Sequence, residues 1–205
     1  MTLTWCGHSC FLLETDEGRV VFDPYEPGSV PGLTLPPLAA DTILCSHGHH
    51  DHGWTEGVKQ TYRMPGYRVE TVDSWHDEVE GAKRGENHIH IVCTEGKRIV
   101  HLGDLGHVLT PEQVEKIGRP DVLLIPVGGY YTIDAAQAVQ VCRMLRPKLI
   151  VPMHFRGPGF GYEEIGPVLA FTAQFEEVRT VTGSSVELTE DLAGVLLFSQ
   201  ALQAV

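Results

Sequence analysis

The chain carries a dense histidine cluster in one short stretch. Four of its 11 histidines fall within six consecutive positions, which read His47-Gly48-His49-His50-Asp51-His52. Histidines two residues apart in an extended or tightly turned loop can direct two imidazoles at one ion, and the aspartate and histidine that follow can reach a neighbouring ion. Neutral imidazole and carboxylate groups are good ligands for zinc and for other first-row divalent metals. The pattern predicts a metal site, not a solvated histidine-rich loop.

Four more short motifs carry an aspartate or a histidine that could serve a metal site. One precedes the histidine cluster and three follow it. The four groups are Asp23 after Val20–Phe22, His76 in Ser74-Trp75-His76-Asp77, Asp104 in His101-Leu102-Gly103-Asp104, and His154 in Val151-Pro152-Met153-His154. Each is a weak signal alone, but together with the cluster they form an ordered set.

This ordered set resembles the motifs of the metallo-β-lactamase superfamily, and it extends from Asp23 to His154. The resemblance implies that one metal is held by His47, His49 and His76, that the second is held by Asp51, His52 and His154, and that Asp104 bridges the two. It also implies that the Asp23 carboxylate orients a liganding imidazole by accepting its free N–H. A turn-forming aspartate before Pro24 is the alternative for Asp23.

Further motifs resemble the branch of small metal-dependent hydrolases within this superfamily. That branch is similar to ascorbate-6-phosphate lactonase and, more distantly, to N-acyl phosphatidylethanolamine phospholipase D. The motifs are Gly7-His8-Ser9, Gly85-Glu86-Asn87 and Pro126-Val127-Gly128-Gly129. The short interval between His52 and His76 leaves no room for an inserted substrate domain. Within the first motif, His8 either faces the metals or the substrate, or makes structural hydrogen bonds.

The implied activity is that of a dinuclear metal-dependent hydrolase. Two divalent ions, zinc first and manganese or iron as alternatives, would share a water and lower its pKa from 15.7 to about 7. The bridged hydroxide would attack an ester or lactone bond of a small metabolite, with Asp51 orienting it and relaying its proton. A phosphodiesterase acting on a small phosphodiester, a mononuclear iron oxidoreductase on the same fold, and a non-catalytic metal-binding protein are the alternatives.

Composition narrows the partners. With 15 Lys and Arg against 27 Asp and Glu, the formal net charge of −12 disfavours nucleic acid and anionic membranes. Bound metal would add positive charge, so phosphate esters stay open as substrates. No apolar run is long enough for a membrane span, and the N-terminus does not resemble a signal peptide, so we expect a cytoplasmic protein that binds a small molecule. Self-association into a homo-oligomer is left open.

Short strands must position the candidate ligands. The predicted strands of the first half are Thr2–Trp5, Cys10–Glu14, Arg19–Phe22, Asp41–Cys45, Arg68–Val72, His88–Cys93 and Arg98–Leu102. Because His88 and His90 alternate with Ile89 and Ile91, that strand is expected to expose its histidines on a solvated face. The five cysteines are odd in number and include no CxxC pair, so they are expected to be reduced and mostly buried as small apolar groups.

Helices and strands alternate in the second half. Thr110-Pro111-Glu112-Gln113 predicts a helix start and Gly118 its end, and a second helix over Ala135–Leu145 is capped by Asp134 and ended by Arg146-Pro147. A third helix is predicted over Pro167–Phe175, and the strands are Asp121–Pro126, Leu149–Val151, Val178–Val181, Val186–Thr189 and Val195–Phe198. This is one α/β domain over residues 1–205, and the resemblance implies a four-layer αββα sandwich with metals at one edge between the sheets.

Several residues near the motifs have two interpretations. His50 is expected to point away, and His101 and His107 are expected to support Asp104 or lie at the surface, not to bind metal. Trp54 and Trp75 are expected to pack as walls. Tyr130-Tyr131-Thr132 either lines the cleft or caps the following helix, and three loops shape the pocket: Glu26–Pro37, Gly81–Asn87 and Gly157–Tyr162.

Overall fold

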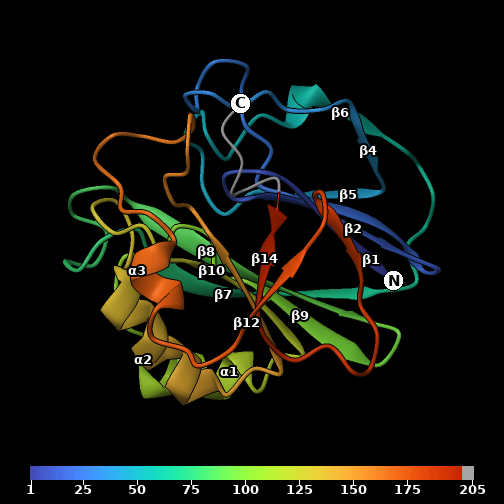
Figure 1. Cartoon of the computed structure of the whole chain (residues 1–205). Helices are drawn as coiled ribbons and strands as arrows, with labels where there is room; N and C mark the ends of the chain where they lie inside the picture. Colours follow the sequence, from blue (N-terminus) through green and yellow to red (C-terminus); the bar gives the residue numbers. More distant parts are fainter. Residues whose placement is uncertain (200–205) are drawn as a thin grey trace.

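The computed structural model describes residues 1–199, so residues 200–205 of the predicted domain lie outside the described part. Two mixed sheets form the body of the molecule (Figure 1). One has the strand order β13 (Ser185–Glu187), β1 (Thr2–Gly7), β2 (Cys10–Thr15), β3 (Gly18–Phe22) and β5 (Thr42–Leu44). The other has the order β12 (Val178–Val181), β14 (Gly194–Phe198), β11 (Leu149–Met153), β10 (Val122–Pro126), β9 (Lys97–His101), β8 (Glu86–Thr94) and β7 (Arg68–Trp75).

Sequence connections explain why both sheets are mixed. Tight turns join β1 to β2, β2 to β3 and β8 to β9, and a longer loop over residues 76–85 joins β7 to β8; each of these pairs is antiparallel. Longer crossovers place β5 parallel to β3, and β9, β10 and β11 parallel to one another. The helices α1 (Pro111–Ile117) and α2 (Ala135–Leu145) lie within the last two crossovers, as expected for parallel neighbours. This is the α/β architecture that the sequence predicted.

The main hydrophobic core lies between the two sheets. Alternate residues of the five-stranded sheet point into it, among them Trp5, Phe11 and Phe22, and the Phe22 ring stacks on His101 at the end of β9 in the other sheet. The residues between them point to the opposite face and form a second, smaller cluster. That cluster contains Cys6, Cys10, Val21, Tyr25, Val30, Leu38, Ala40 and Val58.

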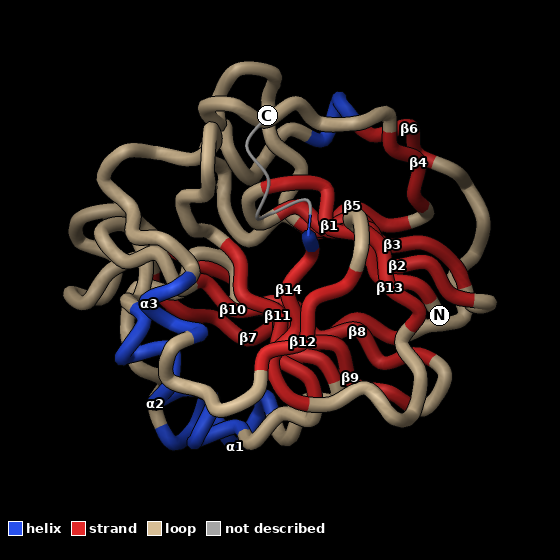
Figure 2. The backbone as a smooth tube through the Cα atoms, in the orientation of Figure 1, coloured by secondary structure: helices blue, strands red, loops and turns tan. Residues whose placement is uncertain are grey.

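The two outer faces are covered differently. In Figure 1, α1, α2 and α3 (Leu169–Thr172) lie together beside the seven-stranded sheet. The outer face of the five-stranded sheet is instead covered by the segment that follows Asp23 and by a small ribbon of β4 (Leu38–Ala40) and β6 (Val58–Gln60). A single 3-10 turn at Thr55–Gly57 is the helical element of that region. Figure 2 shows the two groups of strands and the long loops gathered at one end of them.

The helix signals are confirmed. Thr110 and Gln113 form a capping box at the start of α1, and Asp134 and Gln137 form one at the start of α2. The second helix ends at Arg146, whose backbone is left-handed. The third helix is shorter than the predicted Pro167–Phe175, because no side chain caps its first turn and the flanking residues make turns.

The prediction that β8 exposes both His88 and His90 to solvent is wrong. His90 is only 7% exposed, and its Nε2 donates to the carbonyl of Cys45 at 3.0 Å. The face of β8 that carries His88 and His90 therefore packs partly under the loop that follows β5, and only His88 keeps substantial exposure. The cysteines are free, as expected. Among residues 1–199, no helix has the length and apolar character needed to cross a membrane.

Candidate metal centre

The candidate ligands gather because the strands that carry them run in the same direction. In the five-stranded sheet β1, β3 and β5 run one way, and in the seven-stranded sheet β7, β9 and β11 do. The C-terminal ends of parallel strands meet at one sheet edge, where α/β proteins commonly place their ligands. The residues at or just beyond these ends are His8, Asp23, His47, His76, Asp104 and His154.

Backbone turns at three of these ends are unusual. His8, Asp23 and His154 immediately follow β1, β3 and β11, and all three have positive φ angles, of 52°, 42° and 50°. A residue with a side chain rarely adopts this left-handed region, and such residues cluster at functional sites. Three strands thus end in the same strained turn at the same edge.

The first side-chain cluster contains His47, His49 and His76. One ligand atom from each lies within 4.8 Å of the others. The ring centroids are 4.6 Å apart for His47 and His49, and 4.7 Å apart for His47 and His76. These are the three imidazoles that the resemblance implied for one metal.

The second cluster contains Asp51, His52 and His154, as the resemblance implied, and His8 as well. Its ligand atoms also lie within 4.8 Å of one another. The His8 ring is 1% exposed, 4.2 Å from the His154 ring between centroids, and its Nε2 is 3.5 Å from Asp51 Oδ2. His8 therefore faces the candidate metal site, and its ring nitrogens make no hydrogen bond within residues 1–199.

Asp104 lies between the two clusters. Its Oδ2 is 3.4 Å from His76 Nε2 in the first cluster and 3.2 Å from both His52 Nε2 and His154 Nε2 in the second. A further set of potential ligands, His47, His52 and Asp104, joins the clusters directly. The placement fits the bridging role that the resemblance implied for Asp104.

Asp23 supports imidazoles of both clusters. Its Oδ2 lies 2.8 Å from His52 Nδ1, and its two oxygens accept the backbone N–H and the hydroxyl of Ser46 at 2.6 and 2.7 Å. Because the Ser46 hydroxyl donates to Asp23, its oxygen accepts from His47 Nδ1 at 2.9 Å. The Nε2 lone pairs of His47 and His52 are then directed to the site, which is how carboxylates usually orient metal-binding imidazoles.

The electrostatics of the site fit a divalent metal. Burial lowers the pKa of His8 to about 4 and that of His47 to about 3, and it also lowers the pKa of His76, so these imidazoles keep a free lone pair at neutral pH. Burial would likewise lower the pKa of His52, but the carboxylates of Asp104, Asp51 and Asp23 raise it well above the ordinary value. These carboxylates favour positive charge at that point, as metal ions would supply.

Buried polar atoms without partners point to the same conclusion. In native proteins such atoms are rare, because leaving one unpaired costs about 1–3 kcal/mol. Here they concentrate at this one edge of the sheets. Apart from Ser9 Oγ, those within residues 1–199 belong to candidate ligands: both ring nitrogens of His8, Nε2 of His47 and His52, Nδ1 of His76 and His154, and Oδ1 of Asp104. The donor set therefore fits divalent metal ions.

The three neighbouring histidines, His50, His101 and His107, lie outside the ligand clusters, as predicted. His50 is exposed, and its Nδ1 is 2.8 Å from Glu26 Oε2, away from the clusters. His101 is fully buried under Asp23: its Nε2 donates to Ser9 at 2.8 Å, and its Nδ1 accepts the Gly103 N–H. The Nε2 of His107 accepts the backbone N–H of Trp75. None of the three belongs to the ligand clusters among residues 1–199.

Sequence reasoning gave no role to Asn87, which positions Asp104. The Asn87 side chain is buried; its Oδ1 accepts the Asp104 N–H at 2.8 Å, and its Nδ2 donates to Leu102 and Ser74. Gly103, which precedes Asp104 and contacts Asn87, has a φ of 57°. A Cβ added there would lie 2.3 Å from Asn87 Oδ1 and 2.4 Å from Ser46 Cβ. The only sequence signal was the position of Asn87 in the Gly85-Glu86-Asn87 motif.

A cavity of about 300 Å³ opens over the clusters. Tyr131 lines it, whereas Tyr130 is 64% exposed and does not, and neither Trp54 nor Trp75 is among its lining residues. Tyr162, at the end of the predicted pocket loop Gly157–Tyr162, also lines the cavity; sequence reasoning assigned it no individual role, but its hydroxyl lies 3.1 Å from Asp51 Oδ2 and 2.8 Å from the Ser29 carbonyl. The cavity is lined by His49, Asp51, His76, Arg84, Asp104, Tyr131, His154 and Tyr162.

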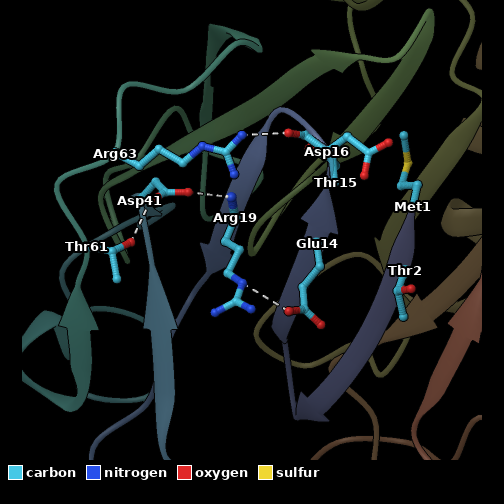
Figure 3. Close-up of a pocket in the computed structure, with 9 residues that line it drawn as sticks. All are labelled: Met1, Thr2, Glu14, Thr15, Asp16, Arg19, Asp41, Thr61 and Arg63. Atoms are coloured by element: carbon cyan, nitrogen blue, oxygen red, sulfur yellow. Dashed lines mark hydrogen bonds and ion pairs between the residues drawn. The ribbon is translucent and has the colours of Figure 1, made fainter.

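A separate hollow of about 580 Å³ lies against β1, β2 and β3 (Figure 3). Its charged residues already contact one another. The Arg19 backbone N–H donates to Asp41, Arg19 Nε lies 3.1 Å from Glu14, and Arg63 donates to the Asp16 carbonyl. None of its lining residues belongs to the clusters of potential metal ligands. The chemistry therefore belongs to the smaller cavity.

Known proteins resemble this chain in sequence and fold. Residues 2–154 match the family model of the beta-lactamase superfamily domain. A UPF0173 metal-dependent hydrolase of Archaeoglobus fulgidus is 31% identical over 194 residues, covering 76% of this chain and 83% of the relative. A crystal structure from Thermotoga maritima, described as a Zn-dependent hydrolase of the metallo-β-lactamase superfamily, is 35% identical with a TM-score of 0.80, covering 96% of this chain and 97% of that one.

A more distant structure shares the fold alone. The isothiocyanate hydrolase from Delia radicum gut bacteria has a TM-score of 0.63 at 16% identity, covering 85% of this chain and 91% of its own. The family model and the Archaeoglobus relative show the family, and the residues of the ligand clusters all lie within the stretch that the family model matches. The chain belongs to the metallo-β-lactamase superfamily, within the UPF0173 family of metal-dependent hydrolases.

Proposed function

We propose that this protein hydrolyses an ester or lactone bond of a small metabolite with two divalent metal ions, zinc first among them. The observation that carries the proposal is the pair of adjacent ligand clusters with Asp104 between them. His47, His49 and His76 would hold one ion, Asp51, His52 and His154 the other, and Asp104 both. Bound ions of this kind polarise the scissile oxygen and lower the pKa of a bound water.

Asp51 is the residue best placed to handle a proton. Burial raises the pKa of its carboxyl, but His52 and His8 lower the pKa by more than burial raises it. The net pKa is therefore below the ordinary value, and the group is ionised at neutral pH. Asp51 lines the cavity, and its carboxylate can orient the attacking water and accept its proton. A positioned carboxylate acts in this way as a general base.

Tyr162 is the neighbouring proton donor. Burial, together with the Asp51 carboxylate, raises the pKa of its phenol, so the hydroxyl keeps its proton at neutral pH. That single proton lies between two acceptors, Asp51 Oδ2 and the Ser29 carbonyl. Rotation of the hydroxyl toward the cavity would let it donate to the oxygen that leaves when the ester bond breaks.

The cavity favours a small substrate. Its volume of about 300 Å³ suits a metabolite, and Tyr131 and Tyr162 stand in its wall, 5.9 Å apart between ring centroids. The net charge of −12 disfavours a nucleic acid as the polymer alternative. Phosphodiesters of similar size stay the competing substrate class, because the same groups could serve attack on phosphorus.

The test is hydrolysis of a substrate panel by protein of measured metal content. Lactones, carboxylic esters and bis(p-nitrophenyl) phosphate are offered with zinc or manganese added. We expect ester or lactone turnover in wild type, and loss of both turnover and bound metal in His49→Ala and Asp104→Ala. His50→Ala is the matched control, because His50 lies in the same loop but points to solvent. Turnover of the phosphodiester alone, or one bound iron with oxygen consumption, would overturn the proposal.

A further inference from the structure

One cation stands in the wall of the cavity over the ligand clusters, and it is Arg84. Its guanidinium carbon lies 5.6 Å from the centroid of the Tyr131 ring, and its Nη2 donates to the Tyr130 carbonyl at 3.1 Å. Neither contact neutralises its charge. Within residues 1–199, the lysines and arginines that form ion pairs with carboxylates are Arg19, Arg68, Lys83, Lys97, Arg98 and Lys148, and Arg84 is not among them.

The position of Arg84 is fixed by the residue that follows His76. The Asp77 carboxylate is completely buried and accepts four backbone N–H groups, from Val79, Gly81, Lys83 and Arg84, at 2.8 to 2.9 Å. The same short segment therefore carries a candidate metal ligand at one end and the guanidinium at the other. The backbone of Arg84 is held in place by its own N–H bond to Asp77.

The free donors of this guanidinium define what it can bind. Arginine has five N–H donors in a planar fork, and the Tyr130 carbonyl accepts a hydrogen bond from only one of its nitrogens, Nη2. The guanidinium lies over the Tyr131 ring, within the range of a cation–π contact. Such a fork matches the two oxygens of a carboxylate or phosphate, which it binds with paired, charge-assisted hydrogen bonds.

We propose that Arg84 binds a second, anionic group of the substrate, a carboxylate or a phosphate, while the scissile bond lies at the ligand clusters. The inference rests on the proposed function and specifies its substrate class: a small ester or lactone that also carries an anion. Charge supports it, since two divalent ions would outweigh the carboxylates of Asp23, Asp51 and Asp104, and Arg84 adds one more positive charge to the same cavity.

The test measures binding of three small acids of similar length to zinc-loaded protein by calorimetry. Butyrate has one carboxylate, succinate has a second at the far end, and 3-phosphonopropionate has a phosphonate there. All three can place one carboxylate at the metal, so the ratio of their dissociation constants reports the second group. We expect succinate, phosphonopropionate or both to bind about ten- to a hundredfold more tightly than butyrate, the range for hydrogen bonds to a charged group. The tighter of the two identifies the preferred anion.

Variants then assign the preference to Arg84. Arg84→Met should bring the ratio close to one, and Arg84→Lys should keep part of it, because the charge stays and the fork is lost. Lys83→Met is the matched control: it removes a cation from the same loop, but that side chain is exposed and pairs with Glu78. Thermal unfolding and zinc content check that the variants are folded and loaded.

The outcomes separate the two proposals. Wild-type protein that binds zinc but has no preference for either dianion overturns the role of Arg84 and leaves the proposed function standing. The same holds for a preference that survives Arg84→Met. Wild-type protein that takes up no divalent metal overturns the proposed function and this inference together.

Discussion

Asp23 Oδ2 lies 2.8 Å from His52 Nδ1, and both side chains are completely buried. The aspartate comes from the end of β3 in one sheet, and the ring it holds stands 3.2 Å from Asp104, which follows β9 in the other sheet. The same carboxylate reaches His47 through the Ser46 hydroxyl. One carboxylate therefore sets the orientation of an imidazole in each of the two ligand clusters.

Replacing this carboxylate should weaken metal binding without removing a candidate ligand. In Asp23→Asn the side chain can no longer accept from both Ser46 and His52, so neither ring is held with its Nε2 toward the site. We expect a ten- to hundredfold loss of zinc affinity, of the order found when carboxylate partners of metal-binding histidines are removed. Competition with a chromophoric chelator measures it.

A second aspartate provides the comparison for this change. Asp41 also accepts from a backbone N–H and a hydroxyl, those of Arg19 and Thr61, but it belongs to the hollow of Figure 3, away from the ligand clusters. Asp41→Asn should leave the zinc affinity at the wild-type value. Equal zinc affinities for wild type and Asp23→Asn would contradict the orienting role of Asp23.

Gly103→Ala should strongly destabilise the fold. The position needs a φ of 57°, and the added Cβ would lie within 2.4 Å of Asn87 and Ser46, two residues that support the site. Left-handed backbone alone costs about 1–2 kcal/mol for a residue with a side chain. The steric clash adds to this, so we expect a loss of more than about 3 kcal/mol in the free energy of unfolding, measured with urea.

Gly96→Ala separates the clash from the backbone cost. Gly96 has a φ of 74° in the turn between β8 and β9, and an added Cβ would meet nothing within 4 Å. This variant should lose only about 1–2 kcal/mol, the backbone cost. If the two alanine variants were equally stable, the close approach of Asn87 and Ser46 to Gly103 would not be what requires a glycine.

The sequence points to the candidate ligands more clearly than to the residues that support them, because the two are encoded differently. A histidine cluster such as His47–His52 is rare in composition and local in sequence, so it stands out without a structure. Asn87 and Asp77 are single polar residues, and what distinguishes them is burial, which arises only when β8 and the loop after β7 are packed. The burial of His90 could not be predicted for the same reason, because its partner Cys45 is remote in sequence.

The elements of the fold also differ in whether local sequence or distant contacts determine them. Capping residues such as Thr110 and Asp134 act within one turn, so both helix starts could be predicted from the sequence. The β4–β6 ribbon could not, because each strand has three residues and their pairing joins segments that are distant in the chain. The packing of two sheets came from the family resemblance, since no local signal states which face of a strand meets which sheet.

Asp77→Asn should loosen the segment that carries Arg84. Burial alone would raise the pKa of the Asp77 carboxyl, but its backbone N–H donors, that of Arg84 first, lower it to about 2. A depressed pKa means that the ionised carboxylate stabilises the folded state above the ordinary pKa near 4, and that this contribution is lost as the pH falls toward 2. We expect Asp77→Asn to cost about 1–2 kcal/mol at pH 7.

The pH dependence tests the cause. The stability difference between wild type and Asp77→Asn should be constant above about pH 5 and should shrink between pH 4 and pH 2, as measured by urea unfolding at each pH. Glu78→Gln, at the exposed neighbouring position, should have little effect on stability at pH 7. A difference that stays constant down to pH 2 would mean that the lost stability does not come from the carboxylate charge.

His8→Leu should have opposite consequences with and without metal. Both ring nitrogens of His8 are buried without a hydrogen-bond partner, so an apolar side chain of similar size should leave the metal-free protein as stable as wild type or more so. If His8 contributes to holding an ion with Asp51, His52 and His154, the variant should gain less stability when zinc is added. Thermal unfolding in chelator and in excess zinc gives both values.

His50→Leu, at an exposed histidine outside the clusters, should keep the full zinc-induced shift. An unchanged zinc-induced shift in His8→Leu would limit the role of His8 to packing beside His154.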